Sequence, residues 1–353
     1  MRGPLSTVVP LLSALLVSAA EAQERSPFQV GEIQTAPGQR SSGFLEIPEG
    51  VDEGTRVPVT VVHGREPGPV LGLIAGTHGY EYPPILALQN LRDAVDPRSL
   101  SGTLILVHVA NMPSFLGRTI YRSPIDGKNL NRVFPGNPEG TVSERIADVL
   151  TREVIEPADV VLDMHAGDGN EDLRPFIYMP VTGEGALDRE VRELARAFGI
   201  DHIVVDEAPD VNPEQSQFVD HTAISRGVPA LTTETGKLGS TDRAWVAMAE
   251  EGVWRVMAHL DMVDREPERT EGVVWLDDYE VIASPATGLF RPAVEAGYAV
   301  AEGTLLGTLV DLFGDPVAEI RAPFAGVVNY VVSTPPVSEG EPLAMVSRVR
   351  DGG

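Results

Sequence analysis

Two kinds of hydrophobic pattern alternate along the chain from about residue 57. Runs of consecutive apolar residues predict buried strands at 57–62, 70–75, 104–110 and 160–164, and weaker strands at 203–205 and 229–233. Between these runs, apolar residues recur with a helical period, which predicts helices over 83–94, 142–155, 187–198, 218–226 and 243–260. Strands that alternate with helices form a sheet covered on both faces, so the pattern predicts an α/β fold.

The pattern changes after about residue 265. Short β-like runs separated by Gly and Pro replace the helical periodicity, which predicts an α/β domain over 23–265 and an all-β domain over 266–353. Segments 284–290 and 321–328 form a weak two-fold repeat similar to the barrel-sandwich domains that carry biotin or lipoate. No lysine follows Lys237, so the second domain has no attachment site and we expect it to be structural.

The first 22 residues have the features of a secretory signal peptide. A basic start, Met1-Arg2-Gly3, precedes an apolar stretch from Leu5 to Ala19, and Ala20-Glu21-Ala22 fits a cleavage site. This stretch is shorter than the roughly 20 residues of a membrane span, although an uncleaved anchor is the alternative. We therefore expect an exported protein, periplasmic or secreted, with no membrane span after signal removal.

Charge and composition exclude several classes of function. The chain has 27 Lys and Arg against 52 Asp and Glu, a formal net charge of −25, and a mean hydropathy of −0.02. Nucleic-acid binding needs clustered positive charge, which this balance opposes. The chain has no cysteine, which excludes disulfides, thiolate metal ligands and cysteine nucleophiles. A metal ion would therefore be bound through His, Asp and Glu, and no loop has the ligand spacing of a calcium site.

A histidine followed three residues later by a glutamate occurs twice and is a candidate metal-binding pair. His63 and Glu66 lie in what reads as a strand-to-strand turn. His78 and Glu81 lie in a glycine-flanked loop between a predicted strand and a helix. Because ligands in open α/β sheets bind beyond the carboxyl ends of the strands, the second pair is the better candidate. His108 lies inside an apolar strand and reads as a core residue, and His202, His221 and His259 read as surface or packing residues.

Two further predicted strands end in candidate site residues. The strand at 160–164 leads to His165, and Asp163 lies two residues earlier on the same face, where it could orient the imidazole or simply anchor a loop. Glu234 is the last residue of an apolar segment. Burial of a carboxylate there is unfavourable unless the group has a partner or a functional role. Segment 126–136 is rich in amide, guanidinium and turn residues, which favours a role in recognition.

Taken in order, these motifs resemble the succinylglutamate desuccinylase/aspartoacylase family, a branch of the zinc carboxypeptidase superfamily. The resemblance runs from about residue 57 to 239 and includes the layout of the trailing β domain. It implies a mixed sheet flanked by helices, a Zn²⁺ ion bound by His78, Glu81 and His165, and a catalytic glutamate at Glu234. It also implies that Asn131 and Arg132 bind the substrate carboxylate. This chain carries Asn129 where many members carry Asp.

The family's arginine that polarises the scissile carbonyl has two possible matches in this chain. Arg118 and Arg122 both precede the recognition segment, and Arg118 is preferred here. The resemblance implies a zinc-dependent hydrolase that deacylates N-acyl amino acids or similar small carboxylate-bearing amides. A metallocarboxypeptidase acting on peptides or cell-wall fragments is an alternative, and so is an exported zinc- and ligand-binding protein without turnover. The sequence predicts neither the acyl group nor the oligomeric state.

Overall fold

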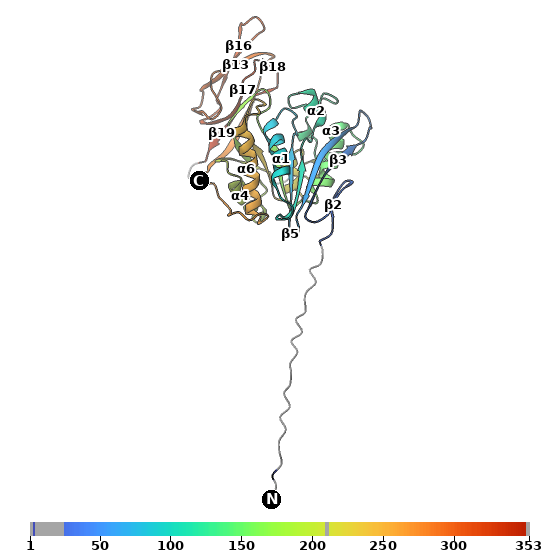
Figure 1. Ribbon diagram of the computed structural model, residues 1–353. Helices are drawn as coiled ribbons and strands as arrows, with labels where there is room; N and C mark the ends of the chain where they lie inside the picture. The colour runs from blue at the N-terminus through green and yellow to red at the C-terminus, as the bar shows by residue number, and fades with distance from the viewer. Residues whose placement is uncertain (1–2, 4–24, 209–211, 351–353) are drawn as a thin grey trace.

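The computed structural model describes residue 3, residues 25–208 and residues 212–350 (Figure 1). The predicted signal peptide, residues 1–22, lies outside the described residues apart from Gly3, so it stays a prediction. Within the described ranges, no helix is both long and apolar enough to span a membrane.

A mixed sheet runs through the whole molecule. Its strand order is β14-β17-β19-β12-β10-β9-β11-β7-β5-β6-β4-β3, with β8 paired to β17. The strands before residue 240 are β3 (Gln39–Ile47), β4 (Thr55–His63), β5 (Glu66–Ala75), β6 (Ser101–Val107), β7 (Val160–His165), β8 (Glu171–Leu173), β9 (Phe176–Val181), β10 (His202–Glu207) and β11 (Ala230–Glu234). Strands β6, β5, β7 and β11 are mutually parallel, whereas β9 runs antiparallel to β11. This parallel centre brings several strand ends to one edge, as the sequence predicted.

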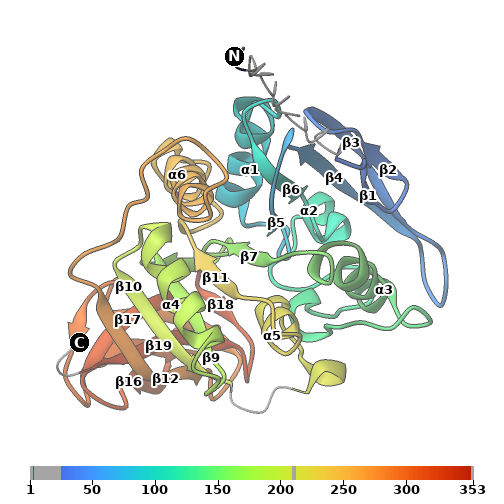
Figure 2. The same ribbon diagram turned by 90° about the horizontal axis from the view of Figure 1, so that it is seen from below.

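Helices cover both faces of this sheet. On one face α6 (Arg243–His259) packs against α1 (Tyr82–Ala94) and α4 (Leu187–Phe198), while α3 (Val142–Leu150) and α5 (Val219–Ile224) lie on the other (Figure 2). The helix expected over 142–155 ends at Leu150 and continues as a π-helical turn, η2 (Thr151–Ile155). The sequence analysis did not anticipate the strands β3, β8 and β9. It also missed α2 (Met112–Gly117), the 3-10 turns η1 (Leu130–Arg132) and η3 (Pro213–Gln215), and the hairpin β1 (Phe28–Val30) and β2 (Ile33–Thr35).

The C-terminal region is all β, as predicted, and it extends the central sheet. Strand β12 pairs in parallel with β10, and β19, β17 and β14 follow it outward. The remaining strands form a second sheet in the order β16-β15-β13-β18. The bounds are β12 (Val274–Ala283), β13 (Gly288–Pro292), β14 (Ala299–Val300), β15 (Leu305–Val310), β16 (Pro316–Arg321), β17 (Gly326–Val332), β18 (Pro336–Val337) and β19 (Pro342–Val349).

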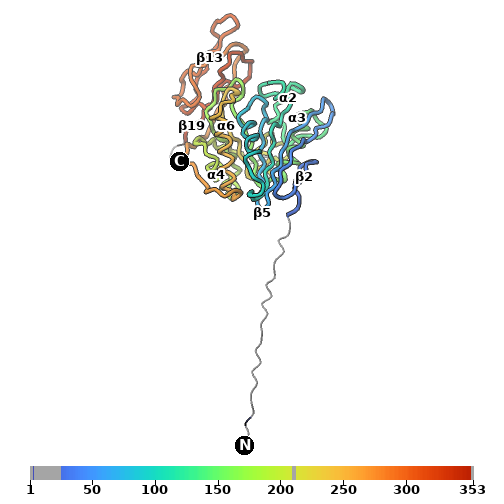
Figure 3. The backbone as a smooth tube through the Cα atoms, viewed as in Figure 1, coloured from blue at the N-terminus to red at the C-terminus, as the bar shows by residue number. Residues whose placement is uncertain are grey.

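A separate hydrophobic core holds the two C-terminal layers together. Buried side chains from both sheets form it, among them Phe290, Leu309, Val328 and Val346. The region lies beside the helices and at one end of the molecule (Figure 3). Because β12 hydrogen-bonds to β10, the C-terminal region is fixed beside the strand ends of the α/β part. The α/β fold with a C-terminal all-β region is therefore confirmed, and the boundary at residue 265 stays a prediction.

Candidate active site

Three parallel strands deliver the candidate metal and catalytic residues. The loop after β5 carries His78 and Glu81, and this loop can turn sharply because Gly76 adopts φ +69°. Strand β7 ends at His165, and its neighbour β11 ends at Glu234, directly in register with His165. Pairing of adjacent parallel strands therefore places Glu234 beside a candidate metal ligand, although the two residues are far apart in sequence.

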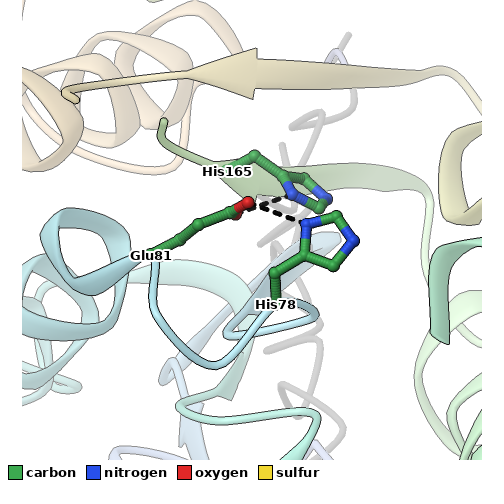
Figure 4. A group of neighbouring side chains, drawn as sticks. All are labelled: His78, Glu81 and His165. Atoms are coloured by element: carbon green, nitrogen blue, oxygen red, sulfur yellow. Dashed lines mark hydrogen bonds and ion pairs between the residues drawn. The ribbon is translucent and has the colours of Figure 1, made fainter. Parts of the chain in front are cut away.

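His78, Glu81 and His165 converge with their ligand atoms within 4.8 Å of one another (Figure 4). The Nδ1 atom of His78 lies 2.7 Å from Glu81 Oε1, and that of His165 lies 2.8 Å from Glu81 Oε2. All three side chains are buried. Two imidazole nitrogens and a carboxylate are the ligand set of catalytic zinc sites that leave one coordination position for water or substrate. The three residues can therefore hold a metal ion of this type.

The outer nitrogens of both imidazoles are held by oxygen acceptors. The Nε2 atom of His165 lies 2.9 Å from Asp163 Oδ2, and that of His78 lies 3.0 Å from Asn129 Oδ1. Because the backbone N–H of Asn131 also donates to Asn129 Oδ1, this oxygen is the acceptor and His78 Nε2–H is the donor. Both rings thus direct Nδ1 at the shared centre, because a hydrogen bond at the outer nitrogen fixes the orientation of the ring, as it does at metal sites. The amide of Asn129 performs here the orienting task that Asp163 performs for His165.

The electrostatics of the group favour a positive charge at its centre. Burial opposes protonation of His165, but the carboxylates of Asp163 and Glu81 raise the pKa of this imidazole well above its ordinary value. Burial likewise opposes ionisation of Glu81, yet the two histidines lower the pKa of this carboxyl to about 2. A divalent cation would satisfy the same negative potential without protonating the rings. The donor set and the potential therefore both fit a metal ion.

Glu234 presents a carboxylate without a hydrogen-bond partner. Its Oε2 atom is buried and unpaired among the described residues, and the residue lines the cavity that contains the His–Glu–His group. Burial and the nearby charge of Glu81 raise the pKa of Glu234 well above its ordinary value. A carboxyl whose pKa is raised is suited to accept and then return a proton.

The cavity has a volume of about 850 Å³ and also contains the predicted substrate-binding residues. Asn131 is buried, donates to Asp163 Oδ2 and accepts from the backbone N–H of Val219. The Arg132 guanidinium lies 4.7 Å from the centre of the Phe218 ring and has no carboxylate of a described residue within 4.0 Å. An arginine without an acidic partner in a cavity is able to bind a substrate carboxylate in a bidentate manner.

The two candidate arginines for the carbonyl lie in different places. Arg118 caps α2 in a left-handed conformation, is exposed, and is not among the cavity residues. Arg122 does line the cavity, although the sequence analysis preferred Arg118. Arg118 and Tyr121 both have a left-handed backbone conformation, and the turns they make bring Arg122 to the cavity. These backbone conformations could not be predicted from the sequence.

The alternative histidine–glutamate pair is not brought together. His63 is buried and its ring bonds Thr103 Oγ1 at 2.9 Å and the carbonyl of Ser26 at 3.0 Å, whereas Glu66 is exposed. His108 is buried and bonds Thr60 Oγ1 at 2.8 Å, as expected for a core residue. His63 therefore contributes to the packing of the sheet, whereas the side chain of Glu66 faces solvent.

Several cavity residues were not anticipated from the sequence. They are aromatic and acidic residues from β9, β10, α5 and the C-terminal strands, namely Tyr178, Asp206, Asp220, His221, Tyr279 and Tyr330. The sequence predicts a surface or packing role for His221, whereas the structure places this residue in the cavity wall. No alternation of polar residues marked this wall in the sequence, because the polar residues of β10 and β12 are consecutive, at 206–207 and 277–280.

The fold and the site together define a class of protein: an α/β protein with a His–Glu–His group at the carboxyl ends of its parallel strands. Residues 67–260 match the model of the succinylglutamate desuccinylase/aspartoacylase catalytic domain. The chain is 34% identical, over 87% of its length and 91% of the relative's, to the N-alpha-acetyl-L-2,4-diaminobutyric acid deacetylase of Halomonas elongata.

Solved structures give the same assignment. The product-bound ectoine utilization protein EutE (DoeB) from Ruegeria pomeroyi is 30% identical, with a TM-score of 0.79 over 92% of this chain and 98% of that one. A succinylglutamate desuccinylase/aspartoacylase from Rhodobacter sphaeroides is 27% identical, with a TM-score of 0.77 over 88% and 96% of the two chains. The chain belongs to the succinylglutamate desuccinylase/aspartoacylase family. Its relatives are amide-hydrolysing deacylases.

Proposed function

We propose that this protein is a zinc-dependent deacylase of small N-acyl amino acids. The observation that supports this most directly is the composition of one cavity. It combines the His–Glu–His group, the unpaired carboxylate of Glu234 and the guanidinium of Arg132 without an acidic partner. The substrate class also agrees with the deacetylase from Halomonas elongata, which acts on an N-acetylated amino acid.

In this proposal His78, Glu81 and His165 hold the ion, and each of the remaining polar residues has a task. Zinc bound there supplies Lewis acidity, which polarises an amide carbonyl and lowers the pKa of water. Glu234 accepts a proton from the attacking water and returns it to the nitrogen of the departing amine. Arg122 stabilises the negative charge that develops on the carbonyl oxygen, and Arg132 holds the substrate carboxylate. The products are a carboxylic acid and a free amino acid.

We also propose, on the pattern of residues 1–22 alone, that the protein is exported. Expression of the full chain with its natural start, followed by amino-terminal sequencing, tests this. Recovery of a chain beginning at Gln23 outside the cytoplasm is expected. A chain that keeps Met1, or one retained in the cytoplasm, contradicts the proposal.

A substrate panel with purified protein tests the proposed activity. The panel contains N-acetyl and N-succinyl amino acids, short peptides with free carboxyl termini, and cell-wall peptide fragments, each with and without added Zn²⁺. Release of acyl groups only, with one metal ion per chain, is expected. Preferential cleavage of peptides would favour a carboxypeptidase, and binding of metal and ligands without any hydrolysis would favour a binding protein.

The role of Arg132 is open to a direct test. Arg132→Gln is expected to lower kcat/KM for an N-acetyl amino acid by about 10- to 100-fold, because a hydrogen-bonded charge pair contributes about 1.5–3 kcal/mol. The loss should appear mainly as a raised KM, since the carboxylate is bound equally in the ground and transition states. Steady-state kinetics measure both parameters.

Two controls make the Arg132 test specific. The substrate with its carboxylate converted to an amide should be hydrolysed equally slowly by both proteins. Arg174→Gln removes an arginine that pairs with Asp201 outside the cavity, and it should leave kcat/KM unchanged. An equal loss on the amide substrate would show that Arg132 does not bind the carboxylate.

A further inference from the structure

The loop that carries Arg122 has an unusual backbone conformation. Tyr121, the residue immediately before Arg122, has φ +56°, and Arg118 has φ +53°. The left-handed region is unfavourable for residues with a Cβ, and a bulky side chain there is a clear outlier. Such a conformation persists only where the surrounding structure holds the residue in place. Specific contacts must therefore hold Tyr121.

Two hydrogen bonds attach Tyr121 to segment 166–171, which follows β7. The backbone N–H of Tyr121 donates to Asp168 Oδ2 at 3.0 Å. Its hydroxyl donates to Glu171 Oε1 at 2.8 Å, and Asn170 Oδ1 lies 3.0 Å from the same hydroxyl. Glu171 is fixed in turn, because its Oε2 atom accepts from the backbone N–H of Asp168 at 3.0 Å. These contacts, here called the Tyr121 link, join two segments that are distant in the sequence.

Segment 166–171 belongs to the frame that carries the proposed metal and proton-transfer residues. Its first residue, Ala166, donates through its backbone N–H to Glu81 Oε2 at 3.3 Å. It continues directly from β7, whose pairing in register with β11 places His165 beside Glu234. The Tyr121 link therefore connects the neighbouring loop to these residues, and it fixes the distance between them.

One hydrogen bond to the described residues holds the guanidinium of Arg122. Its Nη1 atom donates to the carbonyl of Gly127 at 3.1 Å, in an exposed position. The other contacts are made by the backbone, since the carbonyl of Arg122 accepts from Ser114 Oγ at 3.1 Å and from Thr119 Oγ1 at 2.6 Å. The direction of this side chain into the cavity thus depends on the backbone that carries it, and the Tyr121 link holds that backbone.

We propose that Tyr121 is a positioning residue, which holds the guanidinium of Arg122 where the amide oxygen of the substrate acquires negative charge. This inference rests on the proposed deacylase function and adds a residue to it. A donor stabilises a developing oxyanion only from about 3 Å, and a displacement of about 1 Å can cost about 10²-fold in rate. The hydroxyl of Tyr121 is bonded to Glu171, so Tyr121 acts through Arg122 and not on the reacting atoms.

Steady-state kinetics of Tyr121→Phe test the proposal. This change removes the hydroxyl and keeps the ring, which lies edge-on to His78 with centroids 6.0 Å apart. With the zinc-loaded protein and an N-acetyl amino acid, kcat is expected to fall about tenfold at an unchanged KM, because Arg122 acts on charge that develops only in the transition state. Tyr298→Phe removes an exposed hydroxyl outside the cavity and should change neither constant. A normal kcat, or a raised KM alone, in Tyr121→Phe would overturn the proposal.

A double-mutant cycle shows whether the effect of Tyr121 passes through Arg122. Arg122→Gln alone is expected to lower kcat about 10²-fold, as the loss of one donor to a developing oxyanion does. In that background Tyr121→Phe should cause no further loss, since the group that it positions is absent. If Tyr121→Phe lowers kcat by the same factor in both backgrounds, the two residues act independently and the proposal is wrong.

A binding measurement tests the same point without turnover. Calorimetry with the zinc-loaded protein compares the amino acid product with a phosphinate analogue of the N-acetyl substrate, whose oxygens mimic the tetrahedral intermediate. Tyr121→Phe should weaken binding of the phosphinate about tenfold and leave binding of the product unchanged. Equal weakening of both ligands would indicate general damage to the cavity and would count against the proposal.

A second variant weakens the other half of the Tyr121 link. Asp168→Asn replaces the carboxylate that accepts from the backbone N–H of Tyr121, and it should lower kcat in the same Arg122-dependent way while zinc content stays at the wild-type level. The two hypotheses fail differently. Hydrolysis of no substrate by the wild-type protein would count against the deacylase function. Hydrolysis by the wild type with a normal kcat in both variants would refute the role of Tyr121 alone.

Discussion

In the proposed zinc-dependent deacylase, replacement of Glu234 by glutamine is expected to lower kcat by at least about 10³-fold without loss of the proposed metal ion. The side chain is nearly isosteric, and Glu234 is not among the three residues that can hold the ion, so the metal site should stay intact. The amide can neither accept a proton from water nor return one to the amine, and the expected loss lies within the range of general acid–base catalysis. Single-turnover kinetics and metal analysis of the same sample measure both quantities.

The pH dependence of the wild-type protein provides a second readout of Glu234. Burial and the charge of Glu81 raise its pKa, so this carboxyl takes up a proton at a higher pH than an ordinary glutamate, whose pKa is about 4.3. Because only the ionised form accepts a proton, kcat/KM should fall as the pH drops through this raised pKa. The residual activity of Glu234→Gln should lack this acidic limb, and an unchanged limb would assign it to another group.

The main elements of the α/β part could be predicted because their signals are local. An unbroken apolar run such as 160–164 is expected in the middle of a sheet, where both faces of the strand are covered. The structure agrees, because all residues of β7 are buried. The helix α4 begins and ends at the predicted residues, 187 and 198, because its apolar face is clearly periodic and Gly199 ends it at φ +111°. Such signals require no knowledge of distant parts of the chain.

The residues of the candidate site could be proposed from the sequence for a related reason. His165 and Glu234 each close a buried strand, and the carboxyl ends of parallel strands meet at one edge. The position of His78 and Glu81 in a loop between a predicted strand and a helix then indicated which of the two histidine–glutamate pairs belonged to this edge. The geometry adds what the sequence could not provide, namely that both rings direct Nδ1 at Glu81.

The far wall of the cavity could not be predicted, because it depends on contacts between distant segments. Tyr279 and Asp206 are joined by a hydrogen bond because β12 pairs with β10. These strands lie on opposite sides of residue 265, where the sequence pattern changes from helical periodicity to short β-like runs. The C-terminal strands looked like a separate structural unit. In the folded protein they contribute Tyr279 and Tyr330 to the cavity, so the region that appeared inert shapes the proposed substrate site.

Loss of one proposed metal ligand is expected to abolish both metal binding and activity. His165→Ala removes an imidazole that is held from two sides, by Glu81 and Asp163, and leaves an incomplete ligand set. Zinc content, measured by mass spectrometry, should fall from one ion per chain to below about 0.1, and kcat/KM by at least about 10³-fold. Added Zn²⁺ should raise the melting temperature of the wild-type protein but not that of the variant, since a ligand at 100 times its Kd stabilises by about 2.7 kcal/mol.

Two further variants show whether the effect follows from coordination. His259→Ala removes a histidine at the end of α6, outside the cavity, and should bind zinc like the wild type. Asp163→Asn keeps all three ligands but weakens the acceptor for His165 Nε2, so metal affinity should fall about 10- to 100-fold, with activity restored by excess Zn²⁺. If His165→Ala retained stoichiometric zinc and turnover, the convergence of His78, Glu81 and His165 would be structural, and the hydrolytic site would have to lie elsewhere in the cavity.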